Sequence, residues 1–104
     1  MKRKLHVKDD IDIDQLFSEY KLEIYSSVLD SIKENYRKDE IEEINVVKIS
    51  TQSKEYSINL TRDKFIASLN RCISFFEPME EYEKCQECIN IINDIKNTQK
   101  VYDI

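Results

Sequence analysis

The chain has 104 residues, contains no glycine and only one proline, and carries a net charge of −5 at neutral pH. Because glycine lets the backbone approach a phosphate closely, its absence excludes the glycine-rich loops of nucleotide-binding proteins, the nucleophile elbow of hydrolases and the EF-hand loop. The acidic balance argues against a nucleic-acid-binding protein, which needs basic patches to displace counterions.

The first twelve residues are expected to form either a short N-terminal edge strand or a flexible arm. Residues 4–8 alternate polar and apolar side chains, and Asp9 and Asp10 interrupt the alternation. The basic residues at the start are not followed by an apolar segment, and no run of 18 apolar residues occurs in the sequence. We therefore expect no signal peptide and no membrane contact, and a cytoplasmic protein whose three cysteines are reduced.

Residues 13–36 are predicted to form one long helix, which opens the single α+β domain expected over residues 13–104. Apolar side chains recur there every three or four residues, over about seven turns. Asp12, followed three residues later by Gln15, resembles a capping box at the start of this helix. A straight helix and a helix broken near residues 26–27 both stay open.

A two-stranded antiparallel hairpin and a pair of helices are predicted to follow. Residues 44–51 and 56–60 have the β-branched content and alternation of strands, and the polar residues 52–55 suit a hairpin loop. Thr61 is expected to cap the next helix, and Pro78 to end it and open the last one. Since an isolated hairpin is marginally stable, helices must cover it. The fold class is therefore a two-layer α+β domain in the order helix, hairpin, helix, helix.

The cysteines offer the one spacing known from metal sites. Cys85 and Cys88 form a CxxC pair, and together with Cys72 and His6 they could form a zinc site. The CxxC pair lies inside a predicted helix, whereas zinc knuckles present it on a tight turn. We therefore interpret the three cysteines as small core residues between the last two helices. We predict no catalytic residue, no bound metal and no cofactor, and hence a protein that is not an enzyme.

Four residues are candidates for contact with a partner protein. Glu40, Glu42 and Glu43 lie in an acidic run after the first predicted helix, and Tyr25 lies off the apolar stripe of that helix. An exposed tyrosine among carboxylates is typical of a protein interface, and an acidic surface attracts a basic partner. The sequence therefore predicts partner binding through Tyr25, Glu40, Glu42 and Glu43.

A short segment resembles known sequences. The stretch Ile73–Cys85, with Phe-Glu-Pro ending one helix and Glu-Tyr-Glu-Lys-Cys opening the next, is similar to a segment of small uncharacterised phage proteins. This resemblance implies no activity. The abundance of isoleucine, lysine and asparagine, against one alanine and no glycine, is typical of an AT-rich genome such as that of a low-GC bacterium or its phage.

These observations predict a small acidic binding protein that is encoded by a phage or mobile element. It is expected to dock on a host or viral protein and modulate it, for example as an inhibitor. Two alternatives stay open: a homodimeric assembly protein that pairs through the long first helix, and a protein that binds zinc or a small ligand.

Overall fold

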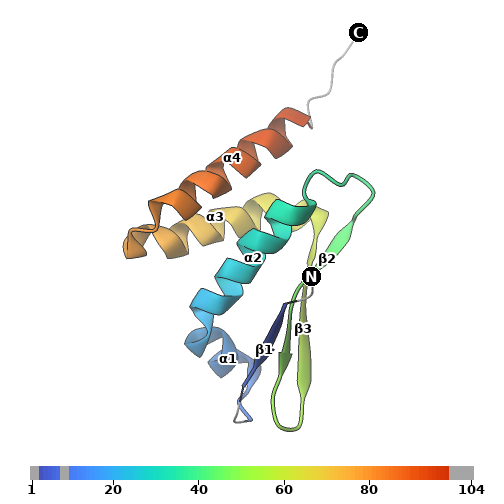
Figure 1. The fold of residues 1–104 in the computed structure, drawn as a ribbon, viewed down its shortest axis with the longest axis vertical. Coiled ribbons are helices and arrows are strands. Elements are labelled where there is room, and N and C mark those ends of the chain that lie inside the picture. The colour runs from blue at the N-terminus through green and yellow to red at the C-terminus, as the bar shows by residue number, and fades with distance from the viewer. Residues whose placement is uncertain (1–2, 8–9, 99–104) are drawn as a thin grey trace.

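The computed structural model of the protein describes residues 3–7 and 10–98. Its elements, in chain order, are β1 (Lys4–His6), α1 (Ile13–Glu19), α2 (Lys21–Asn35), β2 (Glu43–Ser50), β3 (Glu55–Thr61), α3 (Phe65–Phe76) and α4 (Tyr82–Thr98), with single 3-10 turns η1 (Arg62–Lys64) and η2 (Glu77–Met79). Figure 1 shows the helices on one side of a small sheet, with α3 and α4 forming an antiparallel pair. The predicted α+β class is confirmed. Residues 1–2 and 8–9 of the predicted N-terminal arm lie outside the described residues.

The sheet has the strand order β1-β2-β3. β2 and β3 form the predicted antiparallel hairpin, whose turn begins and ends with Thr51 and Lys54, joined by a 2.8 Å hydrogen bond from the Thr51 N–H to the Lys54 carbonyl. β1 lies parallel to β2, so the expectation of an N-terminal edge strand, rather than a free arm, is confirmed for residues 4–6. The sheet is therefore mixed and three-stranded, and not the hairpin alone.

The predicted long first helix is wrong in one respect, because it is two helices. The backbone leaves the helical conformation at Tyr20, with φ −114° and ψ 32°, and not near residues 26–27. Figure 1 shows that α1 and α2 run in different directions on either side of this break. The change of direction lets Leu16 reach the core while Phe17 stays at the surface. The predicted cap of α1 is confirmed, since the Asp12 carboxylate accepts a 2.8 Å hydrogen bond from the Gln15 N–H.

A bulge in β2 determines how α2 packs on the sheet. The pairing register shifts between Asn45 and Val47, so the consecutive residues Val46 and Val47 are both buried. The Val46 carbonyl accepts a hydrogen bond from the hydroxyl of Ser31 on α2, at 3.3 Å. Ser31 is only 1% exposed and also accepts a hydrogen bond from the Arg3 guanidinium. This polar contact joins α2 to β2 and to Arg3, the residue before β1, where the ladder is interrupted.

The ends of α3 differ from the prediction. Thr61 does not cap α3 directly, because the 3-10 turn η1 intervenes and the Thr61 hydroxyl donates to the Asp63 carboxylate. Pro78 lies in the 3-10 turn η2, and α4 begins four residues later than Pro78. Between them Glu80 adopts a left-handed conformation with φ 61°. Such a conformation usually takes glycine at the end of a helix, and the chain has none.

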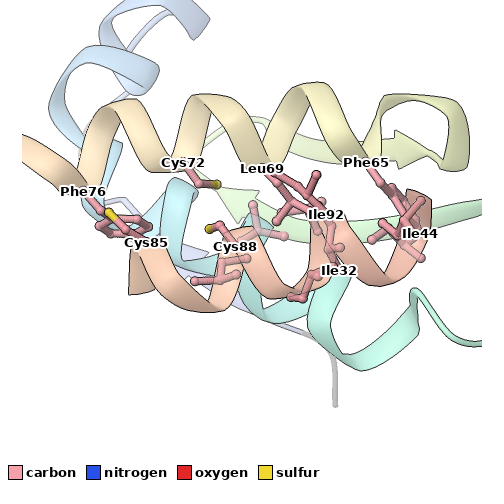
Figure 2. Close-up of a cluster of buried hydrophobic side chains, with 14 of the residues drawn as sticks. Ile32, Ile44, Phe65, Leu69, Cys72, Phe76, Cys85, Cys88 and Ile92 are labelled. Carbon is pink, nitrogen blue, oxygen red and sulfur yellow. The ribbon is translucent and has the colours of Figure 1, made fainter. Parts of the chain in front are cut away.

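The hydrophobic core lies between the sheet and the helices, and it continues between α3 and α4. Figure 2 shows side chains from all these elements meeting in one cluster: Ile32 on α2, Ile44 on β2, Phe65, Leu69, Cys72 and Phe76 on α3, and Cys85, Cys88 and Ile92 on α4. β2 contributes fully buried residues, whereas the residues of β3 that face the helices are only half-buried. The helices therefore cover β2 more completely than β3.

Candidate functional site

The incomplete cover over β3 leaves a cleft of about 430 Å³. Its walls come from α1, the first half of α2, and α3, and its floor comes from β2 and β3. Seven aliphatic or aromatic side chains line it: Phe17, Ile24, Tyr25, Val28, Val46, Ile58 and Leu60. The break at Tyr20 helps to form this cleft, because it places Phe17 over the cleft with 41% of its surface exposed. A mostly apolar cleft with a few polar groups is the usual form of a binding site.

Two cations lie at the rim of the cleft. Lys21 at the start of α2 and Arg71 on α3 both line it, and both are exposed. Neither side chain forms an ion pair with another residue in the part of the chain that the structure describes. The lining carries a single carboxylate, that of Asp14. In a protein of net charge −5, the cleft is thus a local site where an anionic group is favoured.

Tyr25 lines this cleft, but its predicted exposure is wrong. The side chain is half-buried because α3 covers it, and its ring stacks on that of Phe75 with the centroids 4.6 Å apart and an angle of 19°. Tyr25 lines the cleft and also a shallower adjoining hollow that Lys21, Arg71 and Phe75 share. The Tyr25 side chain therefore lies at the boundary between the cleft and the adjoining hollow, and it is partly covered.

The three predicted carboxylates lie elsewhere. Glu40 and Glu42 are exposed in the loop after α2, and Glu43 is exposed at the start of β2. Tyr25 belongs to the first half of α2, and the helix rises about 15 Å between Tyr25 and Asn35. The structure therefore does not bring Tyr25 together with the acidic loop in one patch.

The three cysteines are buried, as predicted. Figure 2 shows the sulfur atoms of Cys72 and Cys88 pointing toward each other between α3 and α4, with Cys85 closer to Phe76. His6 lies far along the chain on β1 and is exposed. Within residues 3–7 and 10–98, no three histidine, cysteine or acidic side chains are grouped so that they could hold a metal ion.

The three thiols differ in acidity. The hydrogen bond between Cys72 and Cys88 raises the pKa of the Cys72 thiol, to which burial also contributes, and lowers the pKa of the Cys88 thiol. Burial also raises the pKa of the Cys85 thiol. All three thiols are buried, which keeps reagents and substrates away from them, so these cysteines suit packing and not nucleophilic chemistry.

We expect all three thiols to react slowly with Ellman's reagent in the folded protein. Burial excludes the reagent, so labelling should require opening of the pair of α3 and α4. The measurement is the rate of colour release with and without denaturant. Three thiols per chain should react at once in guanidinium chloride. Rapid labelling of any thiol in the native protein would contradict the buried placement.

A polar network closes the opposite end of α2 against α4. The Tyr36 hydroxyl donates to the Asp94 carboxylate at 2.7 Å, and the Arg37 guanidinium donates to the same oxygen at 3.1 Å. These two hydrogen bonds lower the pKa of Asp94. A carboxyl group with a lowered pKa in the folded state stabilises the fold above its ordinary pKa, and this contribution disappears as the pH falls.

We therefore expect the protein to lose stability as the pH falls below the ordinary aspartate pKa of 3.8. Asp94→Asn should lower stability at neutral pH and reduce the difference in stability between about pH 7 and about pH 3. The measurement is the urea midpoint at both pH values. Asp39→Asn, which removes an exposed carboxylate from the neighbouring loop, is the control. An unchanged pH dependence in Asp94→Asn would show that the network contributes nothing.

Several residues of the cleft were not singled out from the sequence. Phe17 belongs to the apolar stripe and is indistinguishable there from a core residue, whereas the structure leaves it 41% exposed. Lys21 and Arg71 are 50 residues apart and carry no local signal. Only the packing of α3 against α2 brings them to one rim.

Comparisons with models of protein families, with curated proteins and with solved structures found no match. Among the described residues, no helix is both long and apolar enough to cross a membrane. The function must therefore be inferred from the site itself.

Proposed function

We propose that the protein is a binding module that docks on another protein through the cleft between α1, α2, α3 and the sheet. The observation that carries this proposal is the cleft itself, which has an apolar floor and two cations at its rim that are unpaired within the described residues. Such a site fits a segment that carries apolar side chains and at least one carboxylate. The host or viral nature of the partner, and the origin in a phage or mobile element, are carried over from the sequence as predictions.

The cleft is a better candidate than the acidic loop that the sequence indicated. A binding site needs a concave apolar surface to exclude water around its polar contacts. Glu40, Glu42 and Glu43 are exposed and line none of the described hollows. We propose that these three carboxylates contribute to solubility and to long-range attraction, and that the cleft provides the affinity.

A random peptide display library provides a defined test. The immobilised protein should select peptides that combine apolar and acidic residues. Their affinity should fall about tenfold or more for Phe17→Ala, the loss that truncation of an aromatic anchor causes. Leu22→Ala is the matched control, because Leu22 is 44% exposed nearby but does not line the cleft. Equal losses in both variants would contradict binding at the cleft.

Two further variants separate the cleft from the acidic loop. Arg71→Glu should strongly lower the affinity for an acidic peptide. Reversing the charges of Glu40, Glu42 and Glu43 together should change that affinity by no more than about twofold. The opposite result would assign binding to the acidic loop. Light scattering of the unbound protein tests the homodimer alternative, since a dimer that uses the cleft would dissociate when the peptide binds.

A further inference from the structure

The outer edge of β3 is open to another strand. In the strand order β1-β2-β3, β3 has a neighbour on one side only, and no further strand of the described chain pairs with it. The other edge strand, β1, has three residues, whereas β3 has seven. Natural edge strands are usually protected by proline, lysine or a bulge. β3 contains neither proline nor lysine, and the bulge of this hairpin lies in β2.

The hydrogen bonds of β2 show which groups of β3 are free. The Lys48 N–H donates to the Arg3 carbonyl of the neighbouring chain segment at 3.0 Å, so the backbone of Lys48 faces β1 and not β3. Lys48 lies opposite Ser57. In an antiparallel pair, two directly opposite residues either bond to each other or both point their N–H and C=O groups away from each other. The backbone groups of Ser57 therefore face outward, and by alternation so do those of Glu55 and Asn59.

The same alternation connects this edge to the cleft. The side chains of Ile58 and Leu60 are half-buried on the helix side of the sheet and line the cleft. The side chain of Asn59 between them is exposed and accepts a hydrogen bond from Asn45 on the other face. A strand added to β3 would lie about 4.8 Å away and would place every second side chain on the helix side of the sheet. These side chains would lie next to Ile58 and Leu60, within reach of the apolar floor.

The charges indicate what such a strand should carry. Lys21 and Arg71 stand at the rim of the cleft against the single carboxylate of Asp14. An acidic side chain on the incoming strand could therefore form ion pairs with these two cations, which have no other ion pair among the described residues.

We infer that the partner segment binds as an added β-strand along the outer edge of β3, with alternate apolar side chains in the cleft and a carboxylate facing Lys21 and Arg71. This inference rests on the proposed function and adds the conformation and the chemistry of the segment. Backbone hydrogen bonds to Glu55, Ser57 and Asn59 supply affinity, and the cleft supplies selectivity.

Backbone N-methylation of a peptide selected by the library tests the added strand. Each amide of the peptide is methylated in turn, and the affinity is measured by fluorescence anisotropy. An added strand uses only alternate amides, so methylation of every second residue should weaken binding about tenfold or more and the intervening ones much less. Tolerance at all positions, or losses that recur every three or four residues as in a helix, would overturn the inference.

A pair of variants on the protein gives an independent readout. Ser57→Pro removes the outward N–H at a position where an edge strand accepts proline, whereas Ser57→Ala keeps it. Both lose the Ser57 hydroxyl, which accepts a hydrogen bond from Asn45. We expect only Ser57→Pro to lower the affinity for the peptide, by about tenfold. If Ser57→Pro does not fold, the N-methylation series still decides.

The outcomes for the two proposals are distinguishable. A peptide that depends on Phe17 but is insensitive to N-methylation and to Ser57→Pro leaves the cleft as the binding site and contradicts the added strand. A library that yields no peptide dependent on Phe17 contradicts both.

Discussion

Phe65→Ala is expected to destabilise the protein by about 3–5 kcal/mol, which is the usual cost of removing a buried phenylalanine. The side chain is 1% exposed and begins α3, where it packs between the sheet and the α3–α4 pair (Figure 2). The surrounding side chains come from several elements and cannot close the resulting cavity together. Folded domains have a total stability of about 5–15 kcal/mol, so Phe65→Ala should remove a large share of the free energy of unfolding.

Chemical denaturation of Phe65→Ala and Phe17→Ala measures this effect with a matched pair. Both substitutions remove a phenyl ring, but Phe17 is 41% exposed in the cleft, so its loss should cost much less stability. Phe65→Leu should show an intermediate loss if Phe65→Ala does not fold. Similar losses at positions 65 and 17 would contradict the burial of Phe65 in the core and the exposure of Phe17.

Arg62→Ala should be the second most damaging of the substitutions considered, with a cost of about 2 kcal/mol. The guanidinium of Arg62 donates to the carbonyls of Ile41, at 2.7 Å, Tyr36, at 3.1 Å, and Lys38. It thereby holds the loop between α2 and β2, where the backbone carbonyls follow the end of the helix. Arg62 also lies over the Phe65 ring, 5.3 Å from its centroid.

Arg62→Lys and Lys64→Ala are the controls for this prediction. A lysine ammonium is a compact charge that cannot reach three carbonyls in the fixed geometry of a guanidinium, so Arg62→Lys should recover only part of the loss. Lys64 lies in the same turn and is exposed, so Lys64→Ala should change stability by less than about 0.5 kcal/mol. Urea unfolding gives the energies, and hydrogen exchange of residues 36–42 should accelerate in Arg62→Ala. Unchanged exchange would contradict the role of Arg62.

The local features of the fold were predictable from sequence. The β-branched content of residues 44–51, the alternation of residues 56–60 and the cap at Asp12 are local patterns, and the hairpin and the cap that they predict appear in the structure. The burial of Cys72, Cys85 and Cys88 followed from their helical spacing. The break at Tyr20 was not predictable, because the apolar period continues through it and only packing against the small sheet bends the chain. The left-handed Glu80 was equally hidden, since glycine usually marks such a position.

The candidate site was less predictable than the fold. A cleft forms where elements fail to cover one another, and this depends on the angles between α1, α2 and α3. Tyr25 was predicted as an interface residue from the sequence, and the structure places it at the cleft wall, stacked on Phe75. Arg71 could not be recognised, because only the packing of α3 against α2 brings it to the rim. The free edge of β3 could not be recognised either, because a sequence does not show which strand lies at the edge.

The most direct test of the cleft is an NMR titration of the isotope-labelled protein with a peptide selected from the library. We predict that the amide resonances of Phe17, Arg71 and residues 57–60 shift in a saturable manner, while those of residues 39–43 do not. Shifts confined to residues 39–43, with no change around the cleft, would contradict the account and return the binding site to the acidic loop.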